Sequence, residues 1–104
     1  MKVENSTSET ITISGVAGLD IITAVFQDIE KGEGRLIIQC YGIAWAAYWG
    51  GMGDRTIQEF ILSCDTEYLT DKLWRQTEKR TKRGEEYLSR IIKTVQQAII
   101  IQKT

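Results

Sequence analysis

The sequence predicts an α+β domain, in which an antiparallel sheet of three to four strands from the N-terminal half is packed by two to three helices from the C-terminal half. Two observations carry this prediction. Residues 9–50 contain alternating runs rich in β-branched and aromatic residues, separated by glycines, which is typical of strands joined by tight turns. Residues 54–102 instead place apolar residues three and four positions apart, which is typical of amphipathic helices.

The chain has 104 residues, a length that predicts a single domain over residues 1–104 with one hydrophobic core. Residues 1–8 are polar, and we expect them to be frayed. The sheet is expected within residues 9–50 and the helices within residues 54–102.

Four segments have the pattern of strands, with a turn at residues 15–18 and a polar hairpin connection at residues 30–34. Both faces of the second segment are mostly apolar, so we expect it to be central or covered on both sides. Alanines leave a helix open for the fourth segment, but its flanking glycines and three large aromatics favour a strand. The segments are Glu9–Ser14, Leu19–Asp28, Arg35–Tyr41 and Ile43–Trp49.

Two short helices are expected after the glycine-rich loop at residues 50–53. Asp54 is a good N-cap for the first, and Thr56 with Glu59 can form a capping box instead. The second is expected to start at residue 65 or 66 and to end near residue 74.

A long amphipathic helix is predicted over Glu85–Gln102, and Gly84 either marks its start or interrupts a longer helix. Its apolar stripe consists of Leu88, Ile91, Ile92, Val95, Ala98 and Ile99.

The segment Gly34–Gly53 concentrates large aromatic residues and glycines. Trp45, Tyr48 and Trp49 can form a stacking platform or a protein-binding hot spot. A domain this small also needs such rings for its core, which favours burial of both tryptophans and partial exposure of Tyr48.

Composition argues against an enzyme. There is no histidine, which removes the commonest general base and the commonest metal ligand. Cys40 and Cys64 are too few for a zinc site, and we expect two buried thiols in a reducing, intracellular compartment. No segment has the length of a membrane span, and the polar N-terminus has no signal core. We therefore expect neither catalytic residues nor a cofactor.

Charge is divided along the chain although the net charge is only −1. Residues 1–71 carry four basic and eleven acidic side chains, whereas residues 72–104 carry nine basic and three acidic ones. The basic candidates for binding phosphates or an acidic protein are Lys72, Arg75, Lys79, Arg80, Lys82 and Arg83. The acidic candidates, expected near one end of the sheet with Asp54, are Asp20, Asp28, Glu30 and Glu33. A solvated helix face and ordinary solubilising charge are the alternatives.

The run GRLIIQCYGIAWAAYWGGMGDRTIQEFILSCDTEYLTDKLW, residues 34–74, resembles small proteins encoded by temperate phages and by prophages of enteric bacteria. The shared elements are G-R-L, C-Y-G, A-Y-W-G, M-G-D-R and the S-C-D before Y-L. The resemblance implies a phage accessory protein, which we expect in the host cytoplasm. The lack of catalytic groups in the sequence leads us to expect no enzymatic activity. Its expected partner is a host protein or ribonucleoprotein, in the first place a nucleic-acid-processing defence complex such as CRISPR–Cas, which it would inhibit.

Two alternatives stay open. The chain can bind nucleic acid directly through residues 72–83, or it can be a structural or assembly protein of the virion. A homodimer through the C-terminal helix fits either class, because Ile99–Ile101 is more apolar than one helix stripe needs.

Overall fold

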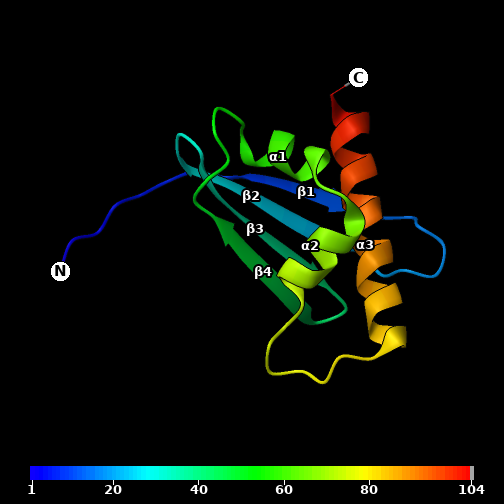
Figure 1. Cartoon of the computed structure of the whole chain (residues 1–104). Helices are drawn as coiled ribbons and strands as arrows, with labels where there is room; N and C mark the ends of the chain where they lie inside the picture. The colour runs from blue at the N-terminus through cyan, green and yellow to red at the C-terminus, as the bar shows by residue number, and fades with distance from the viewer. Residues whose placement is uncertain (104) are drawn as a thin grey trace.

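A computed structural model describes residues 1–103 of the chain. Its strands form one antiparallel sheet in the order β1-β2-β3-β4, and its three helices pack on one face of that sheet (Figure 1). The α+β prediction is therefore confirmed. The elements are β1 (Glu9–Ile13), β2 (Ile22–Glu30), β3 (Glu33–Cys40), β4 (Ile43–Trp49), α1 (Ile57–Ser63), α2 (Thr66–Leu73) and α3 (Lys82–Gln102).

The core lies between the helices and one face of the sheet. Ala24 and Phe26 of β2 are buried and pair with Ile38 and Leu36 of β3, which are buried as well. Residues of the other face, such as Val25, are only half-buried. The second strand is central, as expected, but helices cover only one of its faces.

The strand boundaries differ from the sequence pattern at the turns. β2 starts at Ile22, because residues 16–19 close a turn in which Leu19 N donates to the carbonyl oxygen of Val16. β3 starts at Glu33, directly after a two-residue turn whose Gly32 has a φ of 76°. The same glycine accepts a hydrogen bond from the backbone N–H of Met52 at 2.9 Å, which joins this turn to the β4–α1 loop.

The fourth segment is a strand, and its two tryptophans belong to the core. Trp45 is 4% exposed and Trp49 is 6% exposed, whereas Tyr48 between them is 44% exposed. The Trp49 indole donates a hydrogen bond of 2.7 Å to the hydroxyl of Tyr68 on α2. Burial and this bond fix β4 beneath α2.

Each helix begins at a side-chain cap. Thr56 and Glu59 form the capping box of α1, so the alternative cap at Asp54 is wrong. Asp65 caps α2, and Thr81 caps α3 by accepting from the backbone N–H of Gly84. That cap lets α3 start at Lys82, before the predicted start at Glu85, so that Gly84 lies within the helix.

The face of α3 toward the sheet carries the predicted apolar stripe, and Ala98 is the one stripe member only half-buried. Near the C-terminal end, Ile100 is 53% exposed, beside the fully buried Ile99. No helix within residues 1–103 combines the length and the hydrophobicity needed to span a membrane.

Candidate functional site

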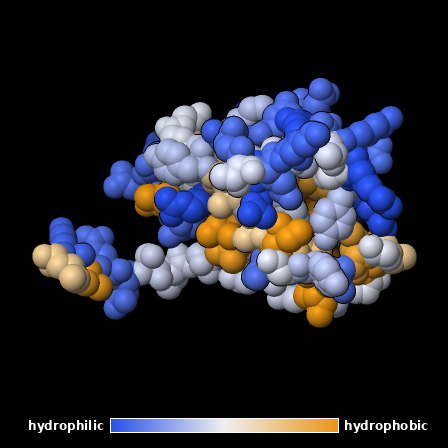
Figure 2. Space-filling view, turned by 90° about the horizontal axis from the view of Figure 1, so that it is seen from below, coloured by the Kyte–Doolittle hydropathy of each residue, from blue (hydrophilic) through white to orange (hydrophobic). Residues whose placement is uncertain are grey.

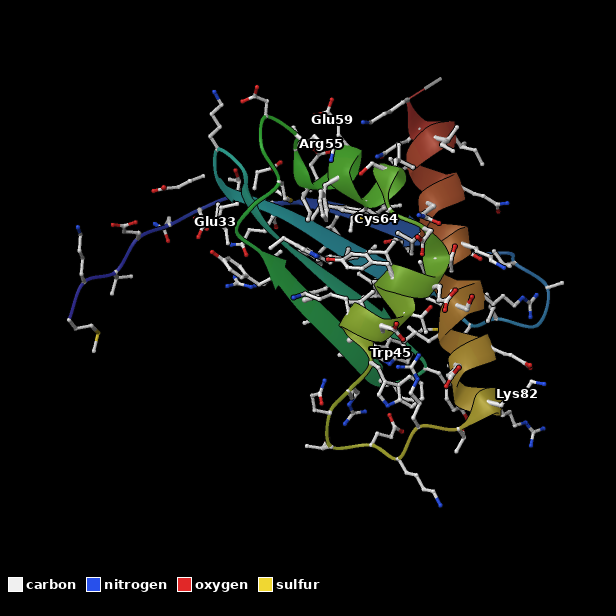
Figure 3. All side chains as sticks on the ribbon, in the orientation of Figure 1. Glu33, Trp45, Arg55, Glu59, Cys64 and Lys82 are labelled. Atoms are coloured by element: carbon white, nitrogen blue, oxygen red, sulfur yellow. The ribbon has the colours of Figure 1, made fainter. Side chains whose placement is uncertain are left out.

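The charged candidates lie at two ends of the molecule. The β2–β3 turn and the β4–α1 loop bring Asp28, Glu30 and Asp54 together at one end. Residues 74–83 lie at the other end, beside the β3–β4 turn (Figure 1). In Figure 3, Glu33 and Lys82 are correspondingly far apart, toward opposite ends of the molecule.

Asp20 is not part of the acidic end, so its predicted place there is wrong. It precedes β2, and its carbonyl oxygen lies 3.7 Å from the sulfur of Cys40, with which it forms a hydrogen bond. Asp20 lies before the start of β2, whereas the β2–β3 turn follows the end of that strand. The length of β2 therefore separates the two positions, roughly 25–30 Å at about 3.3 Å per residue.

Two carboxylates of the acidic end have partners within the protein. Asp28 accepts a hydrogen bond of 2.7 Å from the backbone N–H of Ile57, the first residue of α1. Asp54 forms an ion pair with Lys31 at 3.1 Å. Asp28 therefore stabilises the start of α1, whereas the Asp54–Lys31 pair is exposed and leaves Asp54 accessible to a partner.

Tyr48 connects the acidic end to the uncovered face of the sheet. Its hydroxyl donates to the carboxylate of Glu33, and this bond raises the pKa of Tyr48 above its usual value. The guanidinium of Arg35 lies 6.0 Å from the centre of the tyrosine ring and donates to Gln27 at 2.7 Å. The exposed tyrosine is thus held in one orientation by its neighbours.

Arg80 joins the elements that meet at the basic end of the molecule, which is formed by residues 74–83. Its guanidinium donates to Asp71 on α2 and, at 2.8 Å, to Glu85 on α3, and both bonds raise its pKa. The same group lies 5.5 Å from the ring centre of Trp74. Arg80 therefore ties the 74–81 loop to two helices and is partly neutralised.

Trp74 packs the loop against the start of α3. A Cβ atom added to Gly84 would lie 2.7 Å from an outer ring carbon of Trp74, so only glycine leaves room for the ring. The indole N–H also donates to the carbonyl oxygen of Glu78 at 3.1 Å. The basic segment is consequently a packed loop followed by the first turn of α3, and the alternative of a charged helix face does not describe residues 75–81.

The remaining basic candidates keep their charge exposed. Within residues 1–103, none of them forms an ion pair, and all have exposed side chains. Two of them occupy the first turn of α3, where the helix dipole disfavours cations. Lys72 lies 5.8 Å from the ring centre of Trp49. These residues are Lys72, Arg75, Lys79, Lys82 and Arg83.

A hollow of about 500 Å³ beside this segment was not anticipated from the sequence. Its walls are mostly apolar and are formed by Tyr41, Ile43, Thr81, Arg83, Gly84 and Tyr87. Figure 2 views the end of the molecule that carries the β3–β4 turn, and hydrophobic side chains are exposed there among hydrophilic ones. The available signal was the Tyr41-Gly42 pair between two strand patterns, which marks a two-residue hairpin turn.

Tyr87 lines the hollow, and its hydroxyl contacts the buried Cys40. The Tyr87 hydroxyl donates to the buried Cys40 sulfur at 3.5 Å, and this bond raises the pKa of Tyr87 to about 12. Cys64 is half-buried, and burial raises the pKa of its thiol. Both cysteines are free thiols. Within the described part of the chain, no three histidine, cysteine or acidic residues are grouped as a metal site requires.

Comparison with known proteins assigns the chain to a family. A search of curated proteins and a search of solved structures each found no significant match. The family model Phage_phiTE_072, described as a phage family, matches residues 1–98, which is nearly the whole chain. The protein therefore belongs to this phage family.

Proposed function

We propose that this phage-family protein acts without enzymatic activity, in the host cytoplasm, by binding and inhibiting a host protein. The partner proposed first is a nucleic-acid-processing defence complex of the CRISPR–Cas type. Membership of a phage family supports this proposal, because small phage accessory proteins often act on host machinery. The basic end of the molecule supplies the binding surface.

The observation that carries the proposal is a set of exposed cations on a rigid support. Arg80 and Trp74 fix the 74–81 loop, while Lys79, Lys82 and Arg83 have no acidic partner within the described residues. Cations on a fixed backbone beside exposed aromatic rings match the composition of protein-binding hot spots, which are rich in tyrosine and arginine. Acidic groups of a partner could pair with these cations without first displacing an acidic group of the protein itself.

The test is quantitative affinity capture from bacterial host lysate. The wild-type protein is compared with a triple variant carrying Lys79→Glu, Lys82→Glu and Arg83→Glu. The matched control reverses three exposed cations elsewhere, at Lys2, Lys93 and Lys103. We expect wild type and control to enrich the same protein and the triple variant to lose it. Failure of the wild type to enrich any protein, or equal enrichment by the triple variant, would refute the proposal.

The same free cations also favour a second candidate, direct binding of nucleic acid through residues 72–83. This candidate predicts a mobility shift of DNA or RNA that weakens steeply as salt is raised. Absence of a shift at low salt would eliminate it. Glu78, Glu85 and Glu86 lie among these cations and weaken the local field for a polyphosphate.

A further inference from the structure

The hollow beside the β3–β4 turn is built on a firm floor. Tyr87 is held by its bond to Cys40, and its ring lies 6.2 Å, centre to centre, from the buried ring of Trp45 at a tilt of 58°. Gly84 and Thr81 of the α3 start form another side, where Trp74 packs on Gly84. The walls therefore exist before any partner binds, which lowers the entropic cost of binding.

Tyr41 forms the rim of the hollow at an energetic cost. Its φ of 51° is in the left-handed region, which bulky residues rarely adopt, and Gly42 follows with a φ of 73°. Hairpin turns of this kind strongly prefer Asn-Gly, because both central residues need positive φ. The side chain is 77% exposed, so burial in the free protein does not explain why tyrosine stands here. Strain of this type is concentrated at sites that bind ligands.

Charge decides which partner fits. Arg83 lines the hollow and Lys82 precedes it in the same helical turn, and neither forms an ion pair within residues 1–103. One acidic side chain lies close as well, since the charge of Asp20 acts on Tyr87. A few carboxylates and one apolar side chain suit this arrangement better than a continuous run of phosphates.

We propose that this hollow is the docking site for an acidic peptide segment of the partner protein. One aromatic or large aliphatic side chain of the segment would insert between Tyr41 and Tyr87, and its neighbouring carboxylates would pair with Lys82 and Arg83. The proposal rests on the proposed function and specifies the kind of segment that the protein recognises.

The test is a titration followed by NMR of the amide groups of the full chain. The probe is a seven-residue peptide of aspartate and glutamate with a central phenylalanine, and its control has alanine at the centre. We expect saturable shifts centred on Tyr41, Ile43, Gly84 and Tyr87 with the phenylalanine peptide, and at least tenfold weaker binding of the alanine peptide. Tyr41→Asn and Arg83→Glu should each weaken binding at least tenfold, whereas Ile100→Asn, an exposed site near the other end of α3, should not.

Three outcomes would overturn the proposal. They are an absence of shifts at millimolar peptide, equal binding of both peptides, and tighter binding of an oligothymidine than of the phenylalanine peptide at the same residues. The proposed function is tested separately. If Tyr41→Asn still captures the host protein, the docking site is wrong while the function stands. If the peptide binds but wild type captures nothing, the function is wrong while the docking site stands.

Discussion

Replacing Tyr41 by asparagine should stabilise the protein while removing its proposed binding function. Left-handed backbone costs a bulky residue about 1–2 kcal/mol, and asparagine tolerates it far better. Against this gain stands a small loss of packing. A tyrosine buries at most about 200 Å², so a ring that is 77% exposed loses roughly 45 Å², or about 1 kcal/mol at 25 cal/mol per Å². Asparagine keeps part of that contact.

The net expectation is a rise of about 0.5–1 kcal/mol in the free energy of unfolding, equivalent to roughly 2–8 °C in Tm for a domain of this size. Urea unfolding followed by tryptophan fluorescence measures it directly. Gly42→Ala is the matched control, since its φ is 73° and an added Cβ would meet no atom within 4 Å. It should destabilise the protein by about 1 kcal/mol through backbone strain alone. A Tyr41→Asn variant less stable than wild type would refute the strain argument.

Further predictions concern residues that stabilise the fold and the stability of the protein at alkaline pH. Gly32→Ala should lower the free energy of unfolding by about 1–3 kcal/mol more than Gly15→Ala. Both glycines have positive φ, but only at Gly32 would a Cβ lie 2.8 Å from a backbone oxygen of the β4–α1 loop. Equal losses of stability would contradict this. Gln96→Glu should lower the free energy of unfolding by about 2 kcal/mol at pH 7, because the Gln96 amide donates to two carbonyl oxygens at 3.0 Å. Gln97→Glu, at an exposed position, should change it little. Chemical denaturation of both variants measures the difference. The raised pKa of Tyr87 means that its protonated form is favoured by folding, so this stabilisation is complete below pH 10 and is lost as pH rises towards 12. Tyr87→Phe should remove that decline, and an unchanged stability profile from pH 10 to 12 would argue against the assigned bond.

Local patterns were sufficient to predict the elements of this fold. Alternation identified all four strands. The capping-box spacing of Thr56 and Glu59 gave the correct one of the two candidate starts for α1. The sequence left the start of α3 open between Gly84 and a longer helix, because the periodic stripe begins only at Leu88. The cap at Thr81 depends on a hydroxyl and on the space that Gly84 leaves for Trp74. Caps and packing of this kind involve few residues and leave little periodic signal.

The candidate site was harder to predict, because it depends on which residues the fold brings together. Asp20 was placed at the wrong end of the sheet. It is close to Asp28 in the sequence, but the nine-residue strand β2 extends between the two ends of the sheet and separates them. The engagement of Asp28 with the start of α1 is a contact across 29 positions of the chain. The hollow joins the β3–β4 turn to α3, so the role of Tyr41 becomes visible only when both elements are in place.

The central proposal is that the basic end of the molecule contacts a host protein, with Tyr41 at the rim of the hollow in the interface. The most direct measurement places a photo-crosslinking benzophenone amino acid at position 41 or at position 30, the site of the exposed Glu30 at the acidic end, and irradiates each protein in host lysate. We expect one specific crosslinked host protein from position 41, competed by unlabelled wild type, and none from position 30. A specific product from position 30 with none from position 41 would contradict it.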